Sequence, residues 1–127
     1  MRFLSIYICP ERNTPPTAEE MNTMGKLVED WMKGGKLLAT EGCMPTSLGA
    51  RVRVENGKYN VSDGPFTESK EVVGGFAILD APTKEAAIGY VKEFLDVVGQ
   101  GTCELRQLYD ANSMPCVQEK PEVVTAG

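Results

Sequence analysis

The nine-residue segment 63–71, DGPFTESKE, carries three carboxylates and one lysine directly before a predicted strand. It opens with a turn, because Asp63 can accept hydrogen bonds from backbone N–H groups, Gly64 permits unusual dihedral angles and Pro65 fixes its own. Charged loops held against a sheet are typical of binding and catalytic sites. Asp63 is therefore a candidate general base or hydrogen-bond acceptor. The same residue also suits a purely turn-forming role, and both roles can hold together.

Two further carboxylates and an arginine are candidates for the same site. Glu41 follows a predicted strand and is the second candidate for proton transfer. Glu104 and Arg106 lie two residues apart, on one face of the last predicted strand. The planar guanidinium of Arg106 would anchor a carboxylate or another anion. Alternatively, the glutamates and Arg106 form a network that only neutralises itself, because buried charges are costly unless they are paired.

The remaining candidates are two aromatic residues and a lysine. Tyr7 and Phe66 are predicted to form walls of the pocket, although packing in the core suits both equally well. Lys70 stands between carboxylates and is explained most simply as part of a solvated loop. It could act as an acid or base if burial lowered its pKa.

The residue types exclude several kinds of chemistry. The chain has no histidine and four cysteines, and no two cysteines form a C-x-x-C pair. Zinc sites of the Cys/His type, Cys–His nucleophiles and Ser-His-Asp triads are therefore excluded. No glycine-rich phosphate-binding motif is present. We expect no metal and no cofactor, and we expect reduced cysteines in a cytoplasmic protein.

The composition indicates one ordinary domain. The chain has 127 residues, of which 42% are hydrophobic, and a net charge of −5. This length fits a single domain, and the negative charge argues against nucleic acid and anionic membrane surfaces as partners. No apolar run reaches the roughly 20 residues of a transmembrane helix. We assign residues 1–110 to the domain and 111–127 to a flexible or partner-contacting tail.

Hydrophobic periodicity predicts six strands and two helices. The strands are predicted at 2–9, 36–42, 51–55, 58–62, 75–81 and 102–109. One helix begins at Thr17, with Glu20 completing a capping box, and the other begins at Thr83. Asn56-Gly57 predicts a type I′ hairpin turn, and Gly74-Gly75 predicts a bulge or a close approach of two backbones.

With the hairpin as an insertion, this order is the α+β, ferredoxin-like β-α-β-β-α-β arrangement. In the first strand, the aliphatic face of Leu4, Ile6 and Ile8 is expected to pack under the helices. The mixed face of Phe3, Ser5, Tyr7 and Cys9 is expected to meet a partner or to line a cavity. A sheet with one bare face predicts a homodimer closed face to face, with the pocket on the open sheet face.

Several motifs resemble the DGPF branch of the YCII-related family. They are the block DGPF at 63–66 with Glu68, Lys70-Glu71 and Gly75-Phe76, the segment Glu41-Gly42-Cys43-Met44-Pro45, and Glu104-x-Arg106. The resemblance covers about residues 1–109 and implies a ferredoxin-like fold and a dimeric α/β barrel. Relatives are often proposed to be enzymes with a His/Asp pair, and this chain lacks the histidine. DGPF relatives tend to be encoded near sigma factors of the extracytoplasmic-function type.

Two functions follow as hypotheses. The first is a homodimer that binds a small polar or anionic molecule, with acid–base catalysis by Asp63 or Glu41 if it is an enzyme. Tyr7, Phe66, Lys70, Glu104 and Arg106 would contact the ligand. The second is a non-catalytic sensor or regulatory partner of a sigma factor.

Overall fold

The computed structural model describes residues 1–12 and 14–110. The predicted tail, 111–127, therefore lies outside the described residues. The elements are β1 (Arg2–Pro10), α1 (Ala18–Lys33), β2 (Leu37–Gly42), the short 3₁₀ turn η1 (Thr46–Leu48), β3 (Ala50–Glu55), β4 (Lys58–Asp63), β5 (Glu71–Asp80), α2 (Lys84–Val98) and β6 (Thr102–Gln107).

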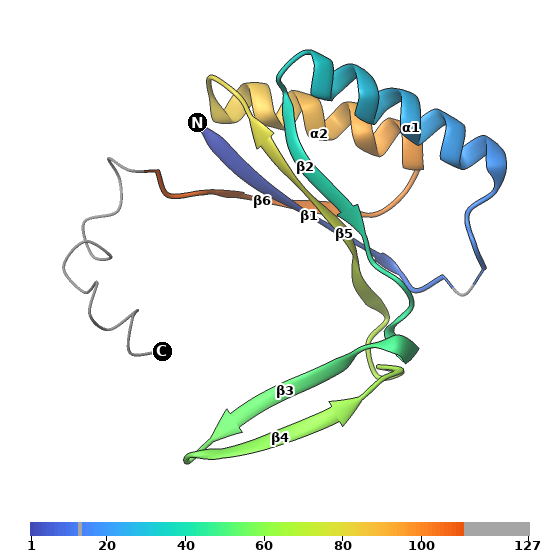
Figure 1. Ribbon diagram of the computed structural model, residues 1–127, viewed down its shortest axis with the longest axis vertical. Coiled ribbons are helices and arrows are strands. Elements are labelled where there is room, and N and C mark those ends of the chain that lie inside the picture. Colours follow the sequence, from blue (N-terminus) through green and yellow to red (C-terminus); the bar gives the residue numbers. More distant parts are fainter. Residues whose placement is uncertain (13, 111–127) are drawn as a thin grey trace.

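Four of the strands form one antiparallel sheet in the order β2-β5-β1-β6. Both helices lie side by side on one face of this sheet (Figure 1). This arrangement confirms the ferredoxin-like fold. β3 and β4 form a separate two-stranded hairpin, inserted between β2 and β5, which projects away from the sheet and the helices. None of the described helices is both long and apolar enough to cross a membrane.

Local sequence signals account for the ends of the helices. The Thr17 side chain accepts from the Glu20 N–H, and the Glu20 carboxylate accepts from the Thr17 N–H, so the predicted capping box is present. Thr83 caps α2 in the same way, by accepting from the Ala86 N–H. α2 ends at Gly99, whose φ of 80° is strained for residues with a side chain.

The core lies between the helices and the sheet. Phe3 on β1 and Leu79 on β5 are directly opposite each other and fully buried, and they pack with side chains of both helices. Apolar burial of this kind is the main favourable term in folding. Trp31, Leu37, Ala81, Ala87 and Val91 complete this buried cluster.

The orientation predicted for β1 is wrong. Phe3, Ser5 and Tyr7 face the helices, whereas Leu4 and Ile6 lie on the open face of the sheet. Both faces of β1 are apolar, so the two-residue period could not decide which of them the helices cover. The face that carries Ser5 and Tyr7 does line a cavity, but this cavity lies beneath the helices and not on the open face where the pocket was predicted.

The open face has an apolar centre and charged edges. The strand register sets Glu41, Phe76, Ile6 and Glu104 in one row across the four strands. The next row is Ala39, Ile78, Leu4 and Arg106. Phe76 is 36% exposed in the single chain, and its aliphatic neighbours on β1 and β5 are half-buried.

The hairpin has the predicted turn and no core of its own. Asn56 and Gly57 have φ values of 51° and 78°, as a type I′ turn requires. All residues of β3 and β4 are exposed. Val52 faces Val61 and Val54 faces Tyr59 across the two strands, so an uncovered apolar stripe runs along one side. An isolated hairpin is marginally stable in water.

Candidate functional site

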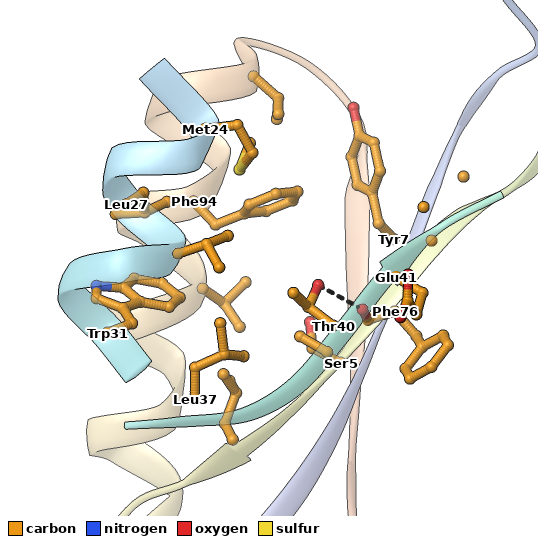
Figure 2. Close-up of a pocket in the computed structure, with 18 residues that line it drawn as sticks. Ser5, Tyr7, Met24, Leu27, Trp31, Leu37, Thr40, Glu41, Phe76 and Phe94 are labelled. Carbon is orange, nitrogen blue, oxygen red and sulfur yellow. Dashed lines mark hydrogen bonds between the residues drawn. The ribbon is translucent and has the colours of Figure 1, made fainter. Parts of the chain in front are cut away.

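A cavity of about 380 Å³ lies between the two helices and the sheet. Figure 2 shows its helical wall, to which Met24, Leu27, Trp31 and Phe94 contribute, opposite the strands. The remaining lining includes the aliphatic side chains of Val28, Leu37 and Val98. The volume is in the range of small-molecule sites, which are mostly apolar with a few fixed polar groups.

Three hydroxyl groups supply the polarity on the sheet side. The Tyr7 hydroxyl donates to the Gln100 carbonyl oxygen at 2.8 Å. The Thr40 hydroxyl donates to the Phe76 carbonyl oxygen at 2.9 Å (Figure 2). The Ser5 hydroxyl, which is buried, bonds to the Cys103 thiol on the neighbouring strand.

Glycines determine where the Tyr7 ring lies. A Cβ added to Gly101 would meet the ring at 2.5 Å, and one added to Gly74 would meet it at 3.1 Å. The ring also packs edge-on against Phe94, with 5.1 Å between the centroids. Burial, followed by the nearby Cys9 thiol, raises the pKa of Tyr7 to about 12. The hydroxyl therefore stays protonated at neutral pH and is not a general base there.

β2 and β5 come together at the mouth of the cavity through two glycines. Gly42 and Gly75 face each other, and a Cβ on Gly75 would lie 2.7 Å from the Glu41 carbonyl oxygen. β5 carries an irregularity where the register shifts between Tyr7 and Ile8 of β1. Both the close approach and the bulge predicted from Gly74-Gly75 are therefore present.

The predicted site residues lie in three separate places in the single chain. Tyr7 lines the cavity from the helix side of the sheet, and Glu41 is at its edge. Glu104 and Arg106 lie on the open face, 3.4 Å apart as an exposed ion pair. Glu41 shares that face but stands on β2, at the opposite edge of the sheet.

Phe66 belongs to a second hollow, of about 520 Å³, at the base of the hairpin. The Arg51 guanidinium lies over its ring, 3.9 Å from the centroid. Arg51 also pairs with Glu68 and donates to the Ser69 hydroxyl at 3.1 Å. A hydrogen bond from its own backbone N–H, followed by one from Arg51, lowers the pKa of Glu68. The Arg51 guanidinium on β3 and the Glu68 carboxylate of this loop thus satisfy each other.

Neither hollow includes Asp63 or Lys70, and both side chains are exposed. Their predicted roles in binding or catalysis stay predictions. The loop after Asp63 is held through Thr46 of η1. The Thr46 hydroxyl accepts from the Phe66 N–H at 3.1 Å and donates to the Glu11 carboxylate at 2.9 Å. The Glu11 carboxylate also accepts from the Thr46 backbone N–H.

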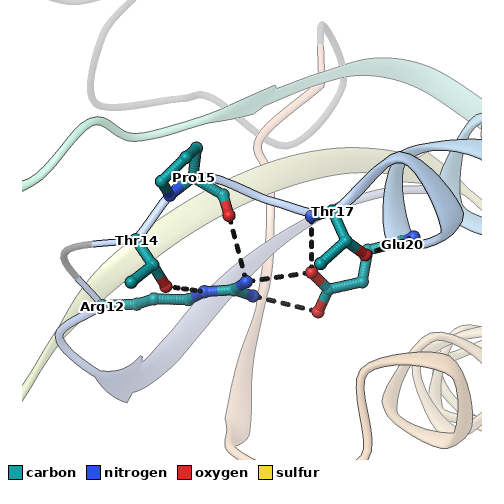
Figure 3. A network of polar contacts seen from close by, with 5 residues as sticks. All are labelled: Arg12, Thr14, Pro15, Thr17 and Glu20. Carbon is teal, nitrogen blue, oxygen red and sulfur yellow. Dashed lines mark hydrogen bonds and ion pairs between the residues drawn. The ribbon is translucent and has the colours of Figure 1, made fainter.

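The polar cluster at the start of α1 is structural (Figure 3). Two nitrogens of Arg12 donate to the two oxygens of Glu20, each at 2.9 Å. Arg12 also donates to the Thr14 hydroxyl and the Pro15 carbonyl oxygen. These bonds fix the loop that leads into α1. Both oxygens of the Glu20 carboxylate accept hydrogen bonds.

The described residues contain no group of three His, Cys, Asp or Glu side chains that could hold a metal ion. Cys9, Cys43 and Cys103 are free thiols, and Cys116 lies outside the described residues. Burial raises the pKa of Cys9 and of Cys103, which makes both thiols less reactive than exposed ones.

Sequence reasoning missed several residues that shape these sites. Ser5 and Thr40 place hydroxyls in the cavity, and Glu11 holds the hairpin base through Thr46. The available signal for Ser5 was that it is a polar residue between Phe3 and Tyr7 on one face of the strand. No local pattern links Glu11 to Thr46, because the contact joins residues 35 positions apart.

Similarity to known proteins extends over most of the chain. An uncharacterized protein of Rhizobium meliloti (strain 1021) is 28% identical over 98 residues, which are 75% of this chain and 79% of that protein. Another similar protein is a solved 5-chloro-2-hydroxyhydroquinone dehydrochlorinase from Burkholderia phenoliruptrix AC1100, in complex with 2,5-dihydroxybenzoquinone. The match covers 88% of this chain and 97% of the dehydrochlorinase chain, with 14% identity and a TM-score of 0.47. The model of the YCII-related domain matches residues 1–112, so the chain belongs to the YCII-related family.

Proposed function

We propose that this protein binds a small molecule in the cavity between its helices and its sheet, and that it acts as a homodimer. The observation that carries the binding proposal is the cavity itself. The cavity of about 380 Å³ is partly open to solvent and is lined by apolar side chains of both helices and of β2 and β5, with hydroxyls on one side only. Apolar side chains that line an unoccupied pocket lack packing partners on that side.

The composition of the open sheet face supports the homodimer. Ile6 and Phe76 form an apolar centre, while Glu41, Glu104 and Arg106 lie on the two edge strands. Interfaces commonly combine an apolar centre with a polar rim. A second copy placed on this face would cover the apolar centre symmetrically, as the isologous interfaces of two-fold dimers do.

If the protein is an enzyme, Glu41 is the carboxylate best placed for proton transfer. Glu41 borders the cavity and carries its carboxylate on the face proposed for the dimer, whereas Asp63 lies at the end of β4. An ionised carboxylate accepts protons, so it would act as a general base. Glu41→Gln should then abolish turnover of an identified substrate and leave its binding intact, measured by single-turnover kinetics and calorimetry.

A thermal-shift screen with a metabolite library tests the binding proposal. A ligand present at about 100 times its Kd adds roughly 2.7 kcal/mol of stability, which is a shift of several degrees for a chain of this size. Val28→Phe, on the cavity wall of α1, should abolish the shift by filling the cavity. Val98→Phe fills it from α2 should Val28→Phe fail to fold. Ile88→Phe adds the same bulk on α2 outside the cavity lining and should leave the shift unchanged.

Two results would refute the proposal. One is a library without any stabilising compound, and the other is full ligand response in a folded cavity-filled variant. The regulatory alternative would be favoured if this protein bound no compound but captured a sigma factor of the extracytoplasmic-function type.

A further inference from the structure

Two of the three hydroxyls that line the cavity, those of Tyr7 and Thr40, already use their hydrogens within the protein. Each hydroxyl has one hydrogen to donate and two lone pairs to accept with. Tyr7 donates to the Gln100 carbonyl oxygen and Thr40 to the Phe76 carbonyl oxygen. The remaining capacity of both oxygens is therefore acceptor capacity. A ligand that reaches either oxygen can add a hydrogen bond only by donating one.

Nothing in the described lining favours a negative charge. None of the lining residues is Lys or Arg, and the side chain of Glu41, at the edge of the cavity, lies on the open face of the sheet. The indole of Trp31 carries an N–H, but Figure 2 shows its nitrogen on the side of the ring away from the strands. An anion in such a place would lose hydration without gaining a cation.

From this pattern of acceptors we infer that the cavity selects neutral molecules that donate hydrogen bonds from a compact apolar body, such as alcohols and phenols. The inference rests on the proposed function and names the ligand class of the same site. It differs from the anionic ligand expected from Arg106, because Arg106 lies on the other face of the sheet.

Three matched probes separate this inference from the proposed function. They are 4-propylphenol, its methyl ether 1-methoxy-4-propylbenzene, and 4-propylbenzoate, with binding to the full-length protein measured by calorimetry at neutral pH. The phenol should bind at least about tenfold more tightly than the ether, because the ether has no donor and faces the oxygens with lone pairs. The benzoate, which is ionised, should bind more weakly still.

Equal or tighter binding of the ether or the benzoate would overturn the inference and leave the proposed function standing. Failure of all three probes to bind would count against both. Tyr7→Phe and Thr40→Val each remove one acceptor oxygen, and at least one of them should reduce the preference for the phenol over the ether. Tyr59→Phe is the matched control, because Tyr59 is 79% exposed on the hairpin. The comparison of probes on the unmodified protein remains decisive if the variants do not fold.

Discussion

Gly64→Ala tests how the loop after Asp63 is attached to the rest of the protein. The Gly64 N–H donates to the Gly49 carbonyl oxygen at 3.0 Å. A Cβ added to Gly64 would lie 1.6 Å from the Thr46 carbonyl oxygen, and real Cβ atoms essentially never come closer than 3.0 Å to such an atom. The obstacle is backbone, so no side-chain rotation relieves it. The loop must move away from η1 by about 1.4 Å, the difference between these two distances.

That displacement is large enough to break two hydrogen bonds. The first is the bond from Gly64 to Gly49, and the second joins the Phe66 N–H to the Thr46 hydroxyl at 3.1 Å. A hydrogen bond contributes about 1 kcal/mol to stability. We therefore expect a loss of about 2 kcal/mol, which lowers the Tm by roughly 8 °C for a domain of this size.

Urea unfolding followed by the fluorescence of Trp31 is the assay. Trp31 is the single tryptophan and is 7% exposed, so its emission reports on the core. Gly89→Ala in α2 is the matched control, because a Cβ there meets nothing within 4 Å. It should raise stability by roughly 0.5–1 kcal/mol, since alanine favours the helix. An unchanged midpoint for Gly64→Ala would show that the loop is not held against η1 as described.

Two other perturbations have defined outcomes. Ile6→Asp places a charge at the apolar centre of the open face and should give a monomer by light scattering at micromolar concentration. The control Ile88→Asp, on α2, should leave the dimer intact. If the unmodified protein is itself a monomer, the proposed dimer is refuted. Arg12 and the helix cap lower the pKa of Glu20 from 4.5 to about 2, so the ionised carboxylate stabilises the folded state above pH 4.5, and this contribution is lost as the pH falls towards 2. The Tm of Glu20→Gln should thus lie below that of the unmodified protein at pH 7 and approach it between pH 4.5 and 2. The control Glu19→Gln should show a smaller, less pH-dependent difference. The same dependence of Tm on pH in both variants would contradict this.

Local signals predicted the elements because each depends on residues close together in the chain. Thr17 and Glu20 form the capping box within one turn, and Asn56-Gly57 supplies the positive φ values of its own turn. β5 is longer than predicted, since it begins at Glu71 rather than Gly75. Its first residues pair with the end of β1, which is a long-range contact that no local pattern contains.

The candidate site depended on information that a sequence pattern does not carry. The carboxylates, Arg106 and the aromatics were recognised by type, but their places were set by which face of each strand the helices cover. β1 offers an apolar face in Leu4 and Ile6 and another in Phe3 and Tyr7, so local alternation is equally consistent with either orientation.

By itself, the sequence determined the order of strands and helices, their caps, the hairpin turn and the family resemblance. The tertiary structure decided that Tyr7 points beneath the helices, where Gly74 and Gly101 leave room for its ring, and that Glu104 and Arg106 lie on the opposite face. The physical reason is that helix capping and turn formation involve neighbouring residues, whereas a cavity exists only where distant elements pack and leave space between them.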